Sequence, residues 1–310
     1  IIIGTRLSIF TPLPNLKLII IDEEHDSSYK QQDSMRYHAR DVAMVRAKRL
    51  NIPVVLGSAT PALETWYNAT VNPNQASQYS LLRLKERAVT AAQLPQIDCI
   101  DADLHPTGHG TQRLEQTLAQ LLPTARIARV DRDSISRKNA LVEILDRVHN
   151  QEIDILVGTQ MLAKGHDFPN LTLVGVIDTD SALHSPDFRA SERLFAQLMQ
   201  VAGRAGRADK AGQVIIQTEF PEHSLFNALR IQDYESYANV LLQEREQMQF
   251  PPYVFTALLR AEANDYSLVQ QFLQLAFAQA RSQSEQVLVY DPVRPQMERL
   301  KGMERGYVLM

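Results

Sequence analysis

An apolar run that ends in acids constrains this chain more than any other feature. Residues 18–21 read Leu-Ile-Ile-Ile, and Asp22, Glu23, Glu24 and His25 follow directly. A run of branched aliphatic residues that ends in carboxylates is typical of a buried strand in a parallel sheet. Open α/β sheets place ligand-binding side chains at the carboxyl ends of such strands. The sequence therefore predicts an α/β fold with a candidate site at residues 22–25.

The chemistry of these acids indicates nucleotide binding. An aspartate in this kind of position can hold the Mg²⁺ of a bound nucleotide, and a neighbouring glutamate can orient or deprotonate an attacking water. Asp22 and Glu23 are the candidates for these two roles. Taken alone, the run predicts a Mg-nucleotide site and nothing more specific.

Composition sets broad limits on the class of protein. The 310 residues suggest two domains and part of a third. No apolar run reaches the ~20 residues that span a bilayer, so we expect a cytoplasmic protein without membrane contact. The lone Cys99 excludes an internal disulfide framework or a cysteine-based zinc site within this sequence. Because the net charge is −4, any nucleic acid must bind at local basic clusters, such as residues 36–49 and 126–138. A solvated helix face explains such clusters at least as well.

Strand-like and helix-like segments alternate along most of the chain, which predicts parallel sheets built from βαβ units. We expect strands at 18–21, 53–56, 98–104, 126–130, 153–157, 171–177 and 213–217, and helices at 39–50, 111–122, 139–148 and 191–202. After Pro251-Pro252 the pattern changes to strands at 254–262 and 286–290 around a helix at 268–280. The predicted domains are therefore an α/β lobe at 1–90, a second α/β lobe at 91–250 and a small α+β domain at 251–310.

Two turns that follow predicted strands carry polar groups. Residues 57–61, Gly-Ser-Ala-Thr-Pro, offer the hydroxyls of Ser58 and Thr60 to the acids, although the same turn alone can simply begin a helix at Pro61. Residues 158–168 begin with Gly-Thr, whose amides and hydroxyl can contact phosphate, and continue to Lys164-Gly165. An ordinary strand-to-helix turn is the alternative for the second segment.

A third motif ends a predicted helix. Residues 200–207 read Gln-Val-Ala-Gly-Arg-Ala-Gly-Arg, with Arg204 and Arg207 set among small residues. Guanidinium groups match phosphate geometry, and an arginine finger stabilises charge that develops on a transferred γ-phosphate. The alternative is a basic helix end that complements the helix dipole.

Aromatic and basic residues alternate immediately after the acids. Tyrosines among cations suit single-stranded nucleic acid, because bases stack on the rings while cations follow the phosphates. The residues concerned are Tyr29, Lys30, Arg36, Tyr37, His38 and Arg40, and Gly4-Thr5-Arg6 adds a weaker candidate contact to a nucleic-acid backbone. A polar surface loop is the alternative.

Together these motifs resemble superfamily 2 helicases of the DEAH type and, more specifically, the PriA family of bacterial replication-restart helicases. The resemblance covers almost the whole chain. It implies two RecA-like lobes, of which the first is partial, followed by a small C-terminal α+β domain. It also implies a 3′→5′ DNA helicase that uses ATP and Mg²⁺, recognises forked DNA and helps to reload the replicative helicase.

The same resemblance assigns roles to residues. The catalytic candidates are Glu23, Gln200, Arg204 and Arg207, and the candidates for binding the nucleotide and its Mg²⁺ are Asp22, His25, Gly158, Thr159, Lys164 and Gly165. Ser58 and Thr60 are the candidates for coupling the state of the nucleotide to the nucleic-acid surface. The candidates for DNA binding are Thr5, Arg6, Tyr29, Lys30, Arg36, Tyr37, His38 and Arg40. The implied partners are forked and single-stranded DNA, primosome proteins and single-strand-binding protein, and we expect a monomer.

Two parts of the family pattern do not appear in the sequence. The phosphate-cradling Gly-x-x-x-x-Gly-Lys-Thr loop would lie upstream of Ile1. The family's cysteine-rich zinc module would belong at the junction near residues 103–108, where a lobe of this type needs another helix and strand. We therefore expect a fragment with poor affinity for ATP and without zinc ligands.

Two other functions stay open at this point. The chain could be a non-catalytic module that binds fork DNA or primosome proteins, which predicts DNA binding without ATPase activity. It could also belong to an RNA helicase of the DEAH class, which a comparison of unwinding on forked DNA and duplex RNA would reveal.

Overall fold

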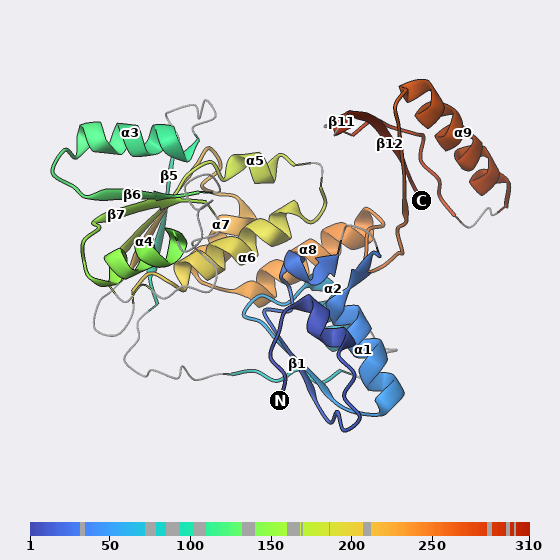
Figure 1. The fold of residues 1–310 in the computed structure, drawn as a ribbon, viewed down its shortest axis with the longest axis horizontal. Helices are drawn as coiled ribbons and strands as arrows, with labels where there is room; N and C mark the ends of the chain where they lie inside the picture. The colour runs from blue at the N-terminus through green and yellow to red at the C-terminus, as the bar shows by residue number, and fades with distance from the viewer. Residues whose placement is uncertain are drawn as a thin grey trace. The chain divides into compact units, whose positions relative to one another are not determined.

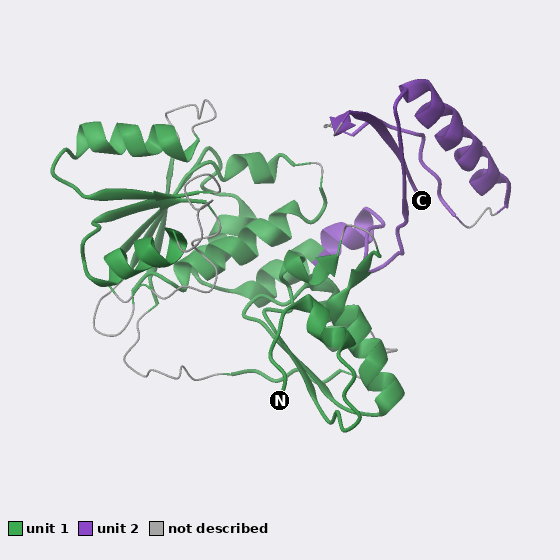
Figure 2. Cartoon of the chain, viewed as in Figure 1, with its two compact units in different colours: residues 1–241 green, residues 242–310 purple. Residues whose placement is uncertain are grey.

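The computed structural model describes residues 1–31, 35–71, 79–84, 94–101, 110–131, 140–159, 168, 170–185, 187–206, 212–283, 287–295, 298–300 and 302–310. The chain divides into two compact units, residues 1–241 and 242–310 (Figure 2). The three predicted domain ranges stay a prediction, and the junction at residues 103–108 lies outside the described residues.

The first part of unit 1 is a small α/β arrangement around two parallel strands (Figure 1). The strands β1 (Ile19–Asp22) and β4 (Val54–Gly57) pair so that Asp22 lies opposite Gly57. Helix α1 (Ala39–Leu50) connects them, and the 3₁₀ helix η1 (Arg6–Phe10) packs against α1. The other elements are η2 (Ser27–Tyr29), the antiparallel pair β2 (Lys30–Gln31) and β3 (Tyr37–His38), and α2 (Leu63–Thr70).

Strand β1 is buried on one face only, which corrects the expected fully buried strand. Ile21 is buried, whereas Ile20 is 66% exposed and its neighbour on β4, Val55, is 44% exposed. Successive side chains of a strand point to opposite faces. Helix α1 contacts both strands, and in the described part of the chain the face that carries Ile20 and Val55 stays exposed.

The second part of unit 1 contains two further groups of parallel strands. One has the order β5-β9-β8 and the other pairs β6 with β7. The strands are β5 (Gln96–Asp101), β6 (Ile127–Val130), β7 (Ile155–Gly158), β8 (Leu173–Val176) and β9 (Gln213–Thr218). The helices are α3 (Thr111–Leu121), α4 (Ala140–His149), α5 (Asp180–Leu183), α6 (Ala190–Ala202), α7 (Ser224–Arg230) and α8 (Tyr234–Gln247), whose last turns belong to unit 2.

The core of this second part is built from helices α6 and α7 and strand β9. Phe195, Phe226 and Ile216 have exposed fractions of 1% or less. Parallel strands covered by helices, in the two successive parts of unit 1, form a mixed α/β fold. The fold class predicted from the sequence is confirmed.

Unit 2 is a small α+β arrangement. Its sheet has the antiparallel order β10-β12-β11, formed by β10 (Leu258–Ala263), β12 (Met303–Leu309) and β11 (Arg299–Leu300). Helix α9 (Tyr266–Gln283) packs Val269 and Leu273 onto the sheet beside Val308. The prediction of a strand at 286–290 is wrong over the described residues 287–290, whose backbone is irregular. The amide of Tyr290 donates a hydrogen bond to the carbonyl of Leu309 in β12 (2.9 Å).

Among the described residues, no helix combines the length and apolar character needed to cross a lipid bilayer.

We predict that Gly212→Ala destabilises unit 1 by about 1–3 kcal/mol, because a methyl group there overpacks the structure. A Cβ on Gly212 would lie 2.4 Å from the carbonyl carbon of Ala205 and from the amide nitrogen of Gly206, which are backbone atoms. Gly175→Ala is the matched control, since a Cβ at that β8 position meets nothing within 4 Å. Urea unfolding followed by the fluorescence of the single tryptophan, Trp66, measures the difference. Equal losses in the two variants would contradict this account of Gly212.

Candidate functional site

In the acidic turn, residues 22–25, the neighbouring carboxylates of Glu23 and Glu24 lie in different environments. Strand β1 ends at Asp22, and Glu23 takes a left-handed conformation with φ of +49°. Its amide donates a hydrogen bond to Asp22 Oδ1 (3.0 Å), and its carbonyl accepts one from the amide of Asp26 (2.8 Å). As a result the Glu23 side chain is 45% exposed, whereas that of Glu24 is 1% exposed. Left-handed backbone costs a non-glycine residue free energy and is found preferentially at functional sites.

His25 links the acidic turn to the turn that follows β4. Its Nδ1 lies 2.7 Å from Ser58 Oγ and 3.6 Å from Glu23 Oε2. Ser58 Oγ also accepts a hydrogen bond from the amide of Thr60 (3.0 Å), and Thr60 is buried. The structure therefore brings His25, Glu23 and the coupling candidates Ser58 and Thr60 into one contact group.

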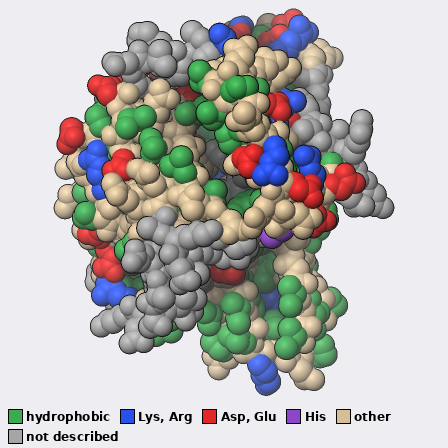
Figure 3. Space-filling view, turned by 90° about the vertical axis from the view of Figure 1, so that its left-hand side faces the viewer, with side chains coloured by type: hydrophobic (Ala, Val, Ile, Leu, Met, Phe, Trp, Pro, Cys, Tyr) green, Lys and Arg blue, Asp and Glu red, His purple; other side chains and the backbone are tan. Residues whose placement is uncertain are grey.

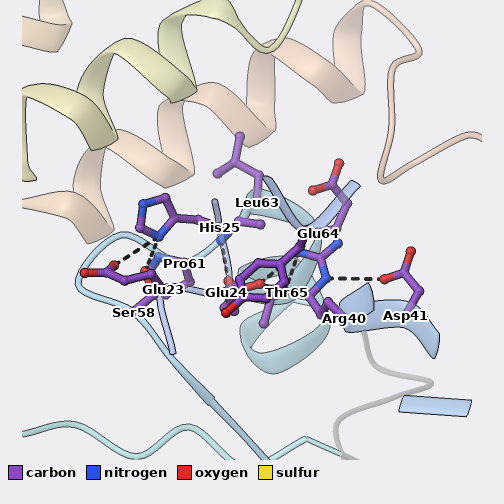
Figure 4. Close-up of polar contacts among 12 residues, drawn as sticks. Glu23, Glu24, His25, Arg40, Asp41, Ser58, Pro61, Leu63, Glu64 and Thr65 are labelled. Atoms are coloured by element: carbon purple, nitrogen blue, oxygen red, sulfur yellow. Dashed lines mark hydrogen bonds and ion pairs between the residues drawn. The ribbon is translucent and has the colours of Figure 1, made fainter. Parts of the chain in front are cut away.

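Glu24, which sequence reasoning left without a role, is the centre of a buried network (Figure 4). Its Oε1 accepts a hydrogen bond from the Ala62 amide (2.6 Å), and its Oε2 accepts bonds from Arg40 Nη1 (2.8 Å) and Thr65 Oγ1 (3.0 Å). Its amide donates to the Gly57 carbonyl (3.1 Å). A buried carboxylate is tolerated only when hydrogen bonds and an opposite charge compensate its lost hydration. Glu24 thus joins β1, β4, α1 and the start of α2.

Arg40 lies inside this network, although the sequence suggested DNA binding. Its side chain is 12% exposed, and its guanidinium also contacts the exposed Asp41 (3.3 Å). Burial works against the charged guanidinium, but the charge and hydrogen bond of Glu24, together with the charges of Asp41 and Glu64, outweigh this and raise the pKa of Arg40. The DNA-binding role of Arg40 stays a prediction, and the contacts that the structure describes for it are structural.

The aromatic and basic residues after the acids gather on the β2–β3 pair and beside it. Lys30 pairs with His38, and Gln31 pairs with Tyr37. The Tyr37 ring packs edge-on against Phe10 of η1, with a centroid distance of 4.9 Å. The predicted DNA-binding segments therefore lie on neighbouring elements of one region.

One hydrogen bond connects this region to the acidic turn, and a second joins η1 to η2. The Tyr29 hydroxyl donates to the carbonyl of Asp22 (2.7 Å), and Arg6 Nη1 donates to the carbonyl of Ser28 (3.0 Å). Burial, followed by the charges of Asp22 and its acidic neighbours, raises the pKa of Tyr29. Thr5 is the N-cap residue of η1, and Arg36 is exposed just before β3.

The phosphate-binding and arginine candidates of the second part lie at element ends. Gly158 ends β7 and Thr159 follows it, both exposed. Gln200 is in the last turn of α6, and Arg204 follows the helix in a turn closed by a hydrogen bond from its amide to the Val201 carbonyl (3.0 Å). Gly206 then takes φ of +70°, a conformation that glycine adopts without steric cost.

No described contact joins these second-part candidates to the acidic turn. Lys164, Gly165 and Arg207 lie outside the described residues.

The acidic turn suits a metal held together with a nucleotide. Within the described ranges there is no group of three or more histidine, cysteine, aspartate or glutamate side chains placed to hold a metal ion. Mg²⁺ is commonly bound by one or two carboxylates, with water and phosphate oxygens completing the shell. The exposed carboxylate of Asp22 at the end of β1 matches that pattern, and Glu23 adds a second exposed oxygen donor.

Charged side chains of both signs are mixed on one face of the molecule. On the face shown in Figure 3, acidic and basic side chains are interspersed and do not form one large basic field. Contacts to a polyanion must therefore be local, as the net charge already suggests.

Comparison with known proteins identifies the family. A family model for the helicase conserved C-terminal domain matches residues 108–209. The chain is 39% identical to the replication restart protein PriA of Haemophilus influenzae, over 88% of this chain and 49% of that protein. It is 36% identical to the Bacillus subtilis PriA over 84% of this chain and 43% of that protein. It is 31% identical to the Rickettsia prowazekii PriA over 100% of this chain and 61% of that protein. The chain belongs to the PriA family.

The chain spans about half the length of the curated relatives it matches. The alignment with the Rickettsia prowazekii PriA runs over 399 residues although this chain has 310. That relative therefore has residues, between the aligned ends, that this chain lacks.

We predict that Glu24→Ala lowers the free energy of unfolding of unit 1 by about 3–5 kcal/mol, because it leaves the Arg40 guanidinium buried without its counter-charge. Adding Arg40→Ala should cost much less than the sum of the two single changes. Asp41→Ala is the control: it removes the exposed partner of the same guanidinium and should change stability by less than about 1 kcal/mol. Urea titrations of the four variants test this, and additive losses would argue against a shared network.

We predict that unit 1 loses stability on acidification between about pH 7 and 5, partly through His38, whose unperturbed pKa is about 6.5. Burial, reinforced by the Arg40 charge, lowers the pKa of His38, and its Nδ1 is buried without a hydrogen-bond partner among the described residues. The unfolded chain then binds the proton first, so stability falls as the pH drops, by at most about 1.4 kcal/mol per pH unit for one proton.

The His38→Gln variant should show a smaller slope between pH 7 and 5, and His149→Gln, at the exposed end of α4, is the control. Equal slopes for His38→Gln and the unchanged chain would contradict the assignment.

Proposed function

We propose that this chain forms the motor part of an ATP-driven DNA helicase that acts in replication restart and moves 3′→5′ on forked DNA. The observation that carries the proposal is the geometry of the acidic turn. Asp22 lies exposed at the carboxyl end of β1 and Glu23 follows it with a side chain that is 45% exposed. His25 connects the turn to Ser58, and Tyr29 connects it to the β2–β3 region. Membership of the PriA family supports the same function.

Three residues of the acidic turn, Asp22, Glu23 and His25, each have a task that their position supports. Bound ATP with Mg²⁺ supplies the phosphoanhydride whose hydrolysis drives movement. The exposed Asp22 carboxylate would hold the ion, and the exposed Glu23 carboxylate would accept a proton from the attacking water. His25 lies 3.6 Å from Glu23 and 2.7 Å from Ser58, so it orients Glu23 relative to the turn after β4.

The second part would supply positive charge and phosphate contacts. In this proposal Gln200, Arg204 and Arg207 face the γ-phosphate, and Gly158, Thr159, Lys164 and Gly165 contact the nucleotide. Primosome proteins and single-strand-binding protein are the proposed protein partners, by membership of the family. A zinc module is proposed for longer relatives only, since Cys99 is the single cysteine of this sequence.

A DNA-binding module without ATPase activity is the second candidate. The β2–β3 region favours it, because Lys30, Arg36 and Arg6 present cations next to Tyr29 and Tyr37 independently of any nucleotide. Bases stack on aromatic rings while cations follow the backbone. This candidate predicts DNA binding by the chain itself.

For the helicase, we predict that Glu23→Gln lowers DNA-stimulated ATP hydrolysis by about 10²–10⁴-fold, because the amide keeps the size of the side chain but accepts no proton. The measurement uses the natural gene product that contains this sequence. The control is Glu246→Gln, which makes the same change at an exposed position of α8. Undiminished turnover in Glu23→Gln would rule out its catalytic role.

For DNA binding, we predict that Lys30→Ala with Arg36→Ala weakens binding of this chain to a forked DNA oligonucleotide and reduces the salt slope of log K by about 1–2. The control pair is Lys48→Ala with Arg49→Ala, which removes two exposed cations from the end of α1. Fluorescence anisotropy at several salt concentrations measures both pairs. Equal losses would move the contact away from β2–β3, and tighter binding to duplex RNA than to forked DNA would favour an RNA helicase.

A further inference from the structure

The start of helix α2 is held by two glutamates that come from different parts of the chain. The amide of Ala62 donates to Glu24 Oε1 (2.6 Å), and the next amide, that of Leu63, donates to Glu192 Oε1 (2.9 Å). Ala62, the N-cap residue, provides no side-chain cap of its own. The first amides of a helix lack partners within the helix and carry partial positive charge, so carboxylates are favoured there. Two adjacent amides thus join the acidic turn to a distant part of the chain.

That distant part is helix α6. Glu192 lies in its first turn, and Gln200 lies in its last turn just before Arg204. The 13 residues of α6 form a rod about 20 Å long, at about 1.5 Å per residue. Phe195 and Leu198 are buried and anchor α6 in the core of the second part. A shift of its first turn is therefore passed along the helix to the end that bears the arginine.

Three further contacts hold α2 against the second part. Glu64 forms an ion pair with Arg189, which immediately precedes α6. The hydroxyl of Tyr234 donates to the carbonyl of Pro61, and its ring packs edge-on against Trp66 with a centroid distance of 5.5 Å. We call these contacts and the bond to Glu192 the α2 clasp.

We propose that Glu192 is a positioning residue, which couples the acidic turn to the arginine-bearing end of α6 through the first turn of α2. Glu24 ties the acidic turn to the Ala62 amide, and Glu192 ties the Leu63 amide to α6. A displacement of the acidic turn therefore moves α2, and α2 moves α6. The consequence for ATP hydrolysis rests on the proposed function, whereas the clasp itself does not.

The first experiment tests the clasp in this chain. Arg189→Glu and Glu64→Arg should each lower the melting temperature of unit 1 by about 2–4 °C, and the double exchange should recover most of the loss. Trp66 fluorescence follows the transition, since it is the single tryptophan. Failure of the double exchange to recover stability would overturn the clasp and the inference with it.

The second experiment separates positioning from simple packing. In the natural gene product, Glu192→Ala should lower the DNA-stimulated kcat by about 10-fold and leave the KM for ATP within about 2-fold, as expected when alignment rather than substrate binding is lost. Glu192→Gln keeps an oxygen acceptor for the Leu63 amide and should recover most of the rate. Arg193→Ala is the control, because Arg193 is the next residue but pairs with Asp187 (2.7 Å). An unchanged kcat in Glu192→Ala, or an equal loss in Glu192→Gln, would overturn the inference.

The third measurement keeps the inference distinct from the proposed function. If the unchanged protein hydrolyses no ATP, the proposed function fails, and the coupling is judged by Trp66 alone. Forked DNA should then change Trp66 emission in this chain, because Arg40 and Glu24 connect the end of β3 to α2. Glu192→Ala should alter that change and Arg193→Ala should not. An absent signal, or the same signal in all three proteins, would overturn the inference.

Discussion

The arrangement of the candidate site depends on one buried carboxylate. Glu24 is 1% exposed and accepts hydrogen bonds from Ala62, Thr65 and Arg40. Moving a carboxylate out of water costs several kcal/mol, which only good geometry and an opposite charge offset. Because Glu24 must satisfy these partners, the chain turns sharply at Glu23, and the left-handed backbone there directs the neighbouring carboxylate outward. The exposed acid that can meet a nucleotide is thus a consequence of the buried acid beside it.

Periodicity and turn chemistry were enough to predict most of the elements. Helix α1 begins at Ala39 and ends at Leu50 as expected, and β9 begins at Gln213, because each is bounded by clear breaks in the apolar pattern. The exposed face of β1 could not be predicted, because a strand with one covered face and a strand with two covered faces can have the same apolar sequence. The prediction of a strand at 286–290 was wrong for a related reason. Val289 is buried, but the described residues 287–290 do not form a strand. Burial alone does not distinguish a strand from irregular backbone.

The candidate site was predictable in its residues but not in its connections. The spacing of Asp22, Glu23 and Ser58 identified chemistry that the structure brings together. It could not say which of three consecutive acids turns inward, because that choice is made by the backbone conformation of Glu23 and by partners 16 to 41 residues away. The bond between Leu63 and Glu192 spans 129 residues of sequence. No local pattern predicts such a contact, so the roles of Glu24, Arg189 and Glu192 emerge only from the fold.

The burial of Arg40 changes how this chain would hold DNA. With a net charge of −4 and with acids and bases interspersed on the face drawn in Figure 3, affinity for a polyanion must come from a few well-placed cations and aromatic rings. The guanidinium of Arg40 is hydrogen-bonded to Glu24. Lys30 and Arg36 are therefore the exposed cations of the hairpin formed by β2 and β3. Arg40 instead connects the end of that hairpin to the start of α2. In the proposed function, Arg40 would therefore link a strand bound at the hairpin to Glu24, and through Glu24 to the acids that would meet the nucleotide, whether or not it also contacts the strand.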